Sequence, residues 1–206
     1  MYLRVANVKA APEEIDKAIG AFEQQVVPGA RTQPGYMGAA LIVDRQTGEA
    51  AGITRWESLE ALNASERFTL EARRQIVASG VANILDVDRY EMVIEEALGE
   101  ASAPGYIRIN EFYMQPDRID ALTAFMRERV AGITSQKGCR AVLMGVNRMT
   151  GHSFVNSVWA TADDRQASEA GVSGLRQEAG SLAGAEPAVR LGEVAFVEMR
   201  QPVKQG

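Results

Sequence analysis

The sequence predicts an α+β protein in which two copies of one small βαββαβ unit lie in a single chain, with their antiparallel sheets packed face to face. Two observations lead to this prediction. The two halves of the 206-residue chain repeat each other, and the expected central strands carry apolar residues on both of their faces. The repeat has the greater weight, because a missed repeat leads to the wrong fold for the whole chain.

The repeat begins at the first strand and continues without a gap into the first helix. Tyr2-Leu3-Arg4-Val5 corresponds to Tyr106-Ile107-Arg108-Ile109, an offset of 104 residues. One residue is lost within the following helix, so that Trp56 corresponds to Trp159 at an offset of 103. Connections tolerate such small changes in length. The matches predict one module at residues 1–98 and a second at 105–201, joined by a linker from Gly99 to Gly105.

Within the first copy, a short apolar strand runs from Tyr2 to Val8. A helix should follow near Pro12, because proline and the acidic residues after it suit a helix N-terminus, and Pro28-Gly29 should end it. The remaining elements are a hairpin of two strands from Gly38 to Trp56, a second helix after the N-cap Ser58, and a strand from Arg89 to Ile94. This order is the ferredoxin-like unit.

The expected middle strands predict how the two units are combined. In Ala39 to Val43, and again in Val142 to Val146, neighbouring residues on both faces are apolar. Both faces of each sheet must therefore be covered, and the two helices of a unit can cover only one. The sheet of the other copy is the best cover for the second face, which predicts a pseudo-dimeric α+β barrel within one chain.

Composition limits the classes of partner. The net charge of −5 gives no excess of cations to replace the counterions of a phosphate backbone, so nucleic acid is not expected. No apolar run reaches the roughly 18 residues that a membrane span needs, and the N-terminus lacks the pattern of a secretion signal, so we expect a cytoplasmic protein without a membrane partner. Cys139 is the single cysteine, which excludes an intrachain disulfide.

The first copy resembles a known family at two motifs. Pro34-Gly35-Tyr36-Met37-Gly38 precedes an apolar strand and a turn, and Arg55-Trp56-Glu57-Ser58 then leads into a helix. These runs are similar to the antibiotic biosynthesis monooxygenase (ABM-like) family of dimeric α+β barrels. The second copy keeps Gly138 and Trp159 but has Ala160-Thr161 in place of Glu57-Ser58, a weaker match. The resemblance implies that the two modules of a family dimer are fused here in one polypeptide.

The family includes cofactor-independent oxygenases of aromatic polyketides or quinols, heme-degrading enzymes and proteins with no assigned role. The resemblance therefore implies a protein that binds a small apolar or aromatic metabolite, with cofactor-independent monooxygenase activity as the associated reaction and a homo-oligomer as a further option. The alternative is a non-catalytic binding or assembly module whose barrel is filled by side chains. An enclosed cavity with a polar group at its base would favour the first.

Arg4 and Arg108 are the first candidate site residues. They occupy equivalent positions in the first strand of each copy, so either could reach a cavity between helices and sheet and bind an anionic or enolate oxygen. The alternative is that each is a buried charge paired with a strand carboxylate such as Glu91 or Glu193. The two interpretations are compatible.

Aromatic residues supply further candidates. Trp56 and Trp159 end equivalent strands, where a tryptophan lines the substrate cavity in some oxygenases of the resembled family; the alternative is packing between strand and helix. Tyr113 is the best placed of the tyrosines to offer a phenol to a pocket, with core packing as its alternative.

Asn7 and Asn110 lie on the first strands, and an asparagine there is similar to one used by heme-degrading relatives. Those enzymes bind iron through a histidine on the second helix, which this chain lacks, so heme is not expected. The only histidine, His152, lies in a hairpin turn and is expected to be solvated. No ligand spacing for a metal and no phosphate-binding glycine loop is present, so we expect no cofactor.

The two copies differ in their second helix. The stretch from Gly171 to Ala188 contains Gly171, Gly174, Gly180 and Gly184. Each costs up to about 1 kcal/mol of helix stability. We therefore expect this helix to be shorter, broken or mobile.

Overall fold

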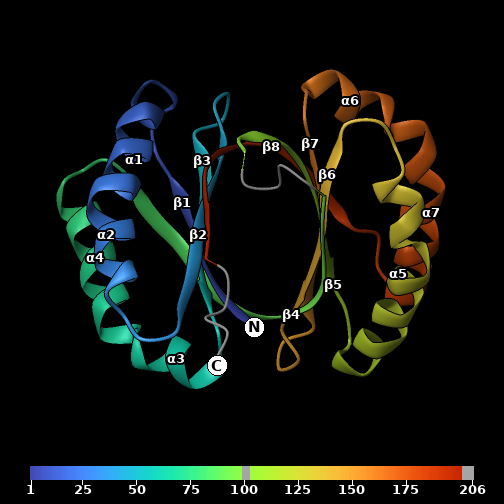
Figure 1. Cartoon of the computed structure of the whole chain (residues 1–206), viewed down its shortest axis with the longest axis horizontal. Helices are drawn as coiled ribbons and strands as arrows, with labels where there is room; N and C mark the ends of the chain where they lie inside the picture. Colours follow the sequence, from blue (N-terminus) through green and yellow to red (C-terminus); the bar gives the residue numbers. More distant parts are fainter. Residues whose placement is uncertain (99–102, 201–206) are drawn as a thin grey trace. The chain divides into compact units, whose positions relative to one another are not determined.

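The computed structural model describes residues 1–98 and 103–200, so most of the expected linker lies outside the described residues. The chain has the order βαββαβ twice, as the sequence predicts (Figure 1). The elements of the first repeat are β1 (Tyr2–Lys9), α1 (Ile15–Ala21), α2 (Val27–Arg31), β2 (Tyr36–Asp44), β3 (Glu49–Trp56), α3 (Leu59–Ala64), α4 (Glu66–Ala78) and β4 (Asn83–Ala97). Those of the second are β5 (Gly105–Tyr113), α5 (Ile119–Thr134), β6 (Cys139–Val146), β7 (His152–Trp159), α6 (Ala162–Ala167), α7 (Glu169–Ala183) and β8 (Ala188–Met199).

The first helix of the first repeat explains the one-residue change of offset. A π-helical turn at Phe22–Val26 separates α1 from α2, whereas α5 is a single α-helix. A π turn holds one residue more than an α turn. The prediction that Pro28-Gly29 ends the helix is wrong, because the π turn places Pro28 in the first turn of α2, where the missing N–H is not needed.

Contacts divide the described residues into two compact units. The first unit comprises residues 1–89 and 193–200, and the second comprises residues 90–192. The ends of β4 and β8 are therefore exchanged between the repeats: β8 pairs antiparallel with β2 from Val43–Glu193 to Gly38–Met199, and β4 pairs with β6 from Glu91–Val146 to Ala97–Ala141. The boundaries 1–98 and 105–201 refer to the sequence repeat and stay a proposal.

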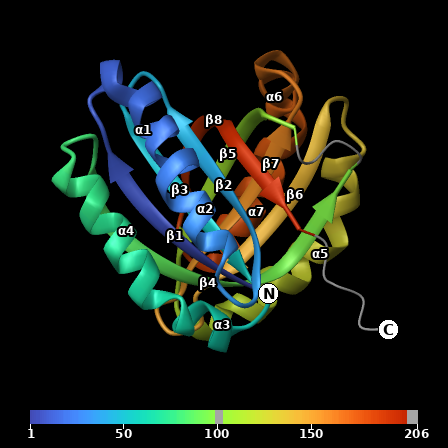
Figure 2. The same cartoon turned by 60° about the vertical axis from the view of Figure 1, so that its left-hand side comes forward.

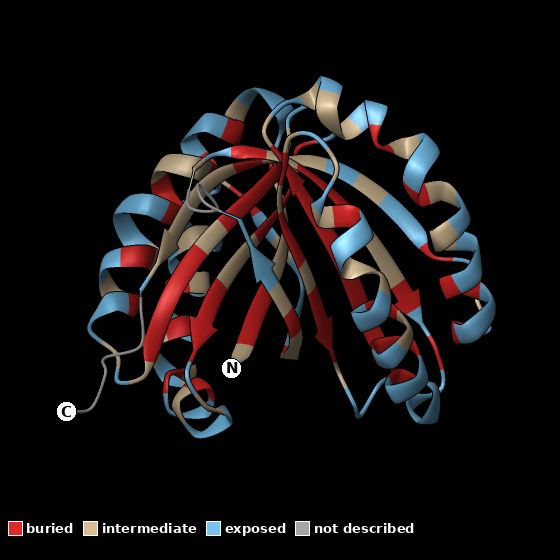
Figure 3. Cartoon of the chain, turned by 45° about the vertical axis from the view of Figure 1, so that its right-hand side comes forward, coloured by how far each residue is buried: buried red, intermediate tan, exposed pale blue. Residues whose placement is uncertain are grey.

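The order of hydrogen-bonded strands is β1-β3-β2-β8-β5-β7-β6-β4, and it closes as in a barrel. In the first unit, α1, α2 and α4 cover one face of the sheet (Figure 2). Buried residues follow the strands, while the helices alternate buried and exposed positions (Figure 3). The predicted α+β barrel of two ferredoxin-like units is confirmed. Among the described residues, no helix has both the length and the apolar character to cross a bilayer.

Each unit has its own apolar core. In the first, Trp56 and Leu62 are fully buried, and Ile15, Phe22 and the strand residues of β2 pack with them. In the second, Trp159, Ile119 and Leu122 are fully buried, and the first two correspond to Trp56 and Ile15. The hairpin turns are also equivalent, since Gly48 and Gly151 both have positive φ values of 76° and 78°, a conformation that favours glycine.

Two expectations about the second repeat are wrong. Helix α7 is neither shorter nor broken: it has 15 residues against 13 in α4, and Gly184 ends it in the left-handed conformation. Burial of Val172, Ala179 and Ala183 on its inner face outweighs the low helix propensity of glycine. His152 is not solvated, because it begins β7 and is only 8% exposed.

Candidate functional site

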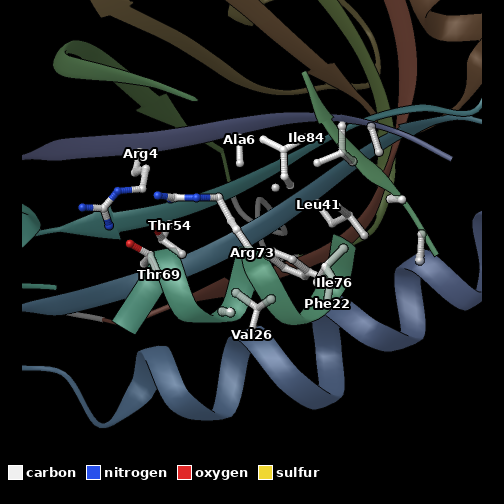
Figure 4. A pocket seen from close by; sticks show the side chains of 16 residues that line it. Arg4, Ala6, Phe22, Val26, Leu41, Thr54, Thr69, Arg73, Ile76 and Ile84 are labelled. Atoms are coloured by element: carbon white, nitrogen blue, oxygen red, sulfur yellow. The ribbon is translucent and has the colours of Figure 1, made fainter. Parts of the chain in front are cut away.

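A cavity in the first unit lies between the sheet and the helices that cover it (Figure 4). Its volume is about 70 Å³, and the empty space between its walls reaches about 690 Å³ when the open mouth is included. Its polar side chains are Arg4, Thr54, Thr69 and Arg73. The apolar lining consists of Ala6, Val8, Ala18, Phe22, Val26, Leu41, Ala50, Gly52, Ala72, Ile76, Ala82 and Ile84.

Arg4 forms the polar end of this cavity. Its guanidinium donates to Ser65 Oγ at 2.8 Å, to the Leu62 carbonyl at 2.7 Å and to Glu66 Oε2 at 2.8 Å. Arg4 is only 2% exposed, and its Nε has no acceptor among the described residues. Burial lowers the pKa of Arg4, which Glu66 partly offsets. The Nε–H of Arg4 is therefore a buried donor without an acceptor among the described residues.

Glu66 connects Arg4 to a second guanidinium. Its Oε1 accepts from Arg73 at 2.9 Å, and its Oε2 also accepts from Arg89 at 2.9 Å. Burial alone would raise the pKa of Glu66, but the hydrogen bond from Arg73 and the charges of Arg4, Arg73 and Arg89 hold that pKa below its ordinary value. Figure 4 shows Arg4 and Arg73 at the same end of the cavity.

Trp56 packs beside Arg4 at the polar end of the cavity. Its ring lies 5.9 Å from Arg4 Cζ, and its Nε1 donates to Thr54 Oγ1 at 3.0 Å. Thr54 lies opposite Arg4 in the β1–β3 register. A tryptophan that is 0% exposed therefore packs beside the arginine without being one of the cavity-lining residues.

The second unit has the equivalent cavity in a reduced form. Its volume is about 30 Å³, with about 420 Å³ of empty space including its mouth. Arg108 repeats the contacts of Arg4, with Ser168 Oγ at 2.9 Å and Glu169 at 3.1 Å. Arg176 binds both carboxylate oxygens of Glu169 at 2.8 and 2.9 Å and donates from Nε to Asn110 Oδ1 at 3.0 Å.

Side-chain size at equivalent positions accounts for the difference. On matching strands and helices, four small residues of the first cavity are replaced by larger ones in the second. The pairs are Ala6 with Asn110, Val8 with Phe112, Gly52 with Val155, and Ala72 with Leu175. Phe22 and Ile76 are exceptions, with Met126 and Ala179 as their counterparts. The first unit thus keeps open a space that the second largely fills.

The predicted pairing of the buried arginines is correct in kind, but the carboxylates lie on helices. Arg4 pairs with Glu66 and Arg108 with Glu169. Glu91 and Glu193 bind instead to Arg148 and Arg45, at 2.9 and 3.0 Å. Because the last strand of each repeat crosses to the other unit, these two carboxylates lie beside hairpin arginines rather than beside the first strands.

The other predicted site residues are spread over both units. Asn7 donates to Asp86 at 2.7 Å and lines neither cavity, whereas Asn110 lines the second one. Trp159 is fully buried and donates to Ser157 at 3.0 Å. Tyr113 is 63% exposed and stacks on His152 with ring centroids 4.2 Å apart, so it is not packed in a core.

Sequence reasoning missed Arg73 as a site residue. The repeat contains the signal that could have found it: Glu66 and Arg73 lie seven positions apart, two helical turns, and Glu169 and Arg176 repeat this spacing at an offset of 103. Within the described residues, no group of three or more His, Cys, Asp or Glu side chains is arranged to hold a metal ion.

Residues 1–68 match the family model described as antibiotic biosynthesis monooxygenase. The uncharacterized proteins Rv2558 and Rv2557 of Mycobacterium tuberculosis (strain ATCC 25618 / H37Rv) are 26% identical over 132 residues and 25% identical over 165 residues. These matches cover 63% and 79% of this chain. They span 55% of the length of Rv2558 and 73% of that of Rv2557.

Solved structures show the same fold. An anthrone oxidase-like protein superposes with a TM-score of 0.69 at 17% identity, covering 98% of this chain and 94% of that one. A protein of Lactobacillus acidophilus NCFM, named as a candidate monooxygenase, gives 0.68 at 10% identity, covering 97% and 96%. The chain therefore has the α+β barrel fold of these structures, with both repeats in one polypeptide. Its residues 1–68 match the antibiotic biosynthesis monooxygenase family model.

Proposed function

We propose that this chain binds a small apolar or aromatic molecule in the cavity of the first unit. The observation that carries the proposal is the combination of an apolar lining with a polar end at which the buried Nε of Arg4 lacks an acceptor. Buried polar groups are nearly always satisfied. An apolar cavity with few polar groups is the usual form of a small-molecule site, and a ligand oxygen at Arg4 would complete this one.

The second unit would then bind no ligand, because side chains fill the equivalent space. Asn110, Phe112 and Leu175 occupy the space that is open in the first unit. The alternative function, a non-catalytic module with side chains in place of a ligand, fits the second unit better than the first. The proposal therefore assigns ligand binding to one repeat and a supporting role to the other.

Binding is tested by calorimetric titration of the full chain with 2-naphthamide, a neutral aromatic probe. The wild type should bind one equivalent, and Ala72→Leu, which introduces the side chain found at the equivalent Leu175, should lower the affinity by about tenfold or more. Leu175→Ala, made in the second unit, should leave the affinity of the first site unchanged. Absence of binding by the wild type, or undiminished binding by Ala72→Leu, would contradict the proposal.

A second candidate function is oxidation of the bound molecule by dioxygen, supported by the family model that matches residues 1–68. An activated methylene next to phenolic rings would become a carbonyl, with one oxygen atom of O₂ entering the product and the other leaving as water. Among the described residues that line the cavity, there is no carboxylate, histidine or tyrosine to act as a base. The substrate would therefore ionise by its own acidity, and Arg4 would stabilise the anion.

This reaction is tested by oxygen consumption with a panel of quinols and polyketide-like phenols. Arg4→Ala should reduce the rate, whereas Arg108→Ala should retain it, because the cavity beside Arg108 is largely filled. Thermal unfolding of both variants controls for loss of structure. Equal loss of rate in the two variants, with both folded, would be inconsistent with a site in the first unit.

A further inference from the structure

The two repeats differ in the hydrogen-bond acceptors of Arg73 and of its equivalent, Arg176. In the second unit, Arg176 is saturated by the carboxylate of Glu169 and by Asn110 Oδ1, which accepts from its Nε at 3.0 Å. In the first unit, Arg73 donates from Nη2 to Glu66 Oε1 at 2.9 Å. No acceptor for its Nε is found among the described residues. The position of Asn110 is taken there by Ala6, which has no side-chain acceptor.

The backbone register shows that these positions correspond. Ala6 lies opposite Gly52 in the β1–β3 pair, and Asn110 lies opposite Val155 in the β5–β7 pair. Both alanine and asparagine line the cavity of their own unit. The second repeat therefore provides from its own strand an oxygen atom that the first repeat leaves out.

Charge favours an anion at this place. Arg4 and Arg73 share one carboxylate, Glu66, with side chains 3% and 16% exposed. Arg89, which is half exposed, adds a further positive charge at the same carboxylate. Desolvated charges need a partner of opposite sign. In the second unit two arginines, Arg108 and Arg176, share Glu169, and there the Asn110 oxygen and larger side chains leave little room for a ligand.

We propose that the ligand of the first cavity is a monoanion, an apolar or aromatic molecule with one carboxylate-type group, and that Arg73 binds this group together with Arg4. This inference rests on the proposed function, since it names the class of ligand for the same site. A guanidinium is planar and pairs with two oxygens of a carboxylate. The apolar body of the ligand lies against Phe22, Leu41 and Ile84, away from the arginines.

The experiment compares two probes of nearly equal shape, 2-naphthoate and 2-naphthamide, by calorimetric titration of the full chain at pH 7. The wild type should bind naphthoate about tenfold more tightly than naphthamide, a difference of about 1.4 kcal/mol. Arg73→Gln should abolish this preference by lowering the affinity for naphthoate much more than the affinity for naphthamide. Arg176→Gln, the matched change in the second unit, should keep the preference.

A second variant tests the same point without removing the arginine. Ala6→Asn introduces the side chain that satisfies Arg176 in the second unit, so it should also abolish the preference for naphthoate. Equal binding of the two probes by the wild type, or a preference that survives both Arg73→Gln and Ala6→Asn, would overturn the anion proposal while binding in the cavity stands. If neither probe binds, the proposed function itself is wrong, and this inference with it.

Discussion

Arg176 donates a hydrogen bond of 3.0 Å from Nε to Oδ1 of Asn110. The corresponding residues of the first repeat are Arg73 and Ala6, so the same helix arginine faces an alanine there. Two repeats with the same order of elements thus differ in this contact between a strand and a helix. Asn110 helps to fill the second cavity, and its replacement by Ala6 removes the equivalent acceptor from the first.

We predict that Asn110→Ala lowers the free energy of unfolding by about 1–3 kcal/mol, because Arg176 loses an acceptor for a largely buried N–H. Urea unfolding at pH 7 measures this change. Asn7→Ala is the matched control on the first strand: its bond to Asp86 is exposed, and we expect a loss below about 1 kcal/mol. Equal effects of the two variants would show that the bond to Arg176 has no special weight.

Trp56→Phe should lower the free energy of unfolding by about 1–3 kcal/mol. The change leaves a void in a fully buried site and removes the donor to Thr54 Oγ1. Trp159→Phe should have a similar effect in the second unit, where Ser157 loses its donor. Met149→Ala, at a position that is 92% exposed, should stay within about 0.5 kcal/mol of the wild type. Chemical denaturation followed by circular dichroism distinguishes these outcomes.

The stability of the first unit should depend on the ionisation of Glu66. Its pKa in the folded chain lies below the ordinary value of 4.5, so its contribution is present above pH 4.5 and is lost as the pH falls through the folded pKa. Glu66→Gln should remove this part of the acid destabilisation, whereas Glu71→Gln, on the exposed side of the same helix, should not. Thermal unfolding between about pH 6 and pH 3 measures the difference. Parallel pH curves for wild type and Glu66→Gln would refute the assignment.

Cys139 should react slowly with thiol reagents in the native protein. Burial raises the pKa of its thiol to about 11, and the side chain lies within the core of the second unit. The thiolate is the reactive form, so little of it is present at pH 8. Labelling with an aromatic disulfide reagent should therefore be slow in buffer and rapid in denaturant. Rapid labelling of the native chain would mean that this part of the core opens readily.

Much of the fold could be predicted from the sequence, because the repeat indicates each element in two separate stretches of the chain. The paired Trp56 and Trp159, and the hairpin turns that contain Gly48 and Gly151, define the same unit in both halves. The crossing of β4 and β8 could not be predicted, since it depends on which strands pair over a long range. For the same reason, the predicted ion pairs of Glu91 and Glu193 with the first-strand arginines are wrong.

The sequence by itself determined the order of elements, the duplication, and the buried arginine on the first strand of each repeat, because these follow from local patterns and from matching residues. Only the tertiary structure decided which repeat keeps a cavity. That outcome depends on side chains from separate elements meeting in space: Ala6 and Gly52 leave room beside Arg73, whereas Asn110 and Val155 take up room beside Arg176. A local sequence pattern does not predict how side chains that are distant in the sequence pack together.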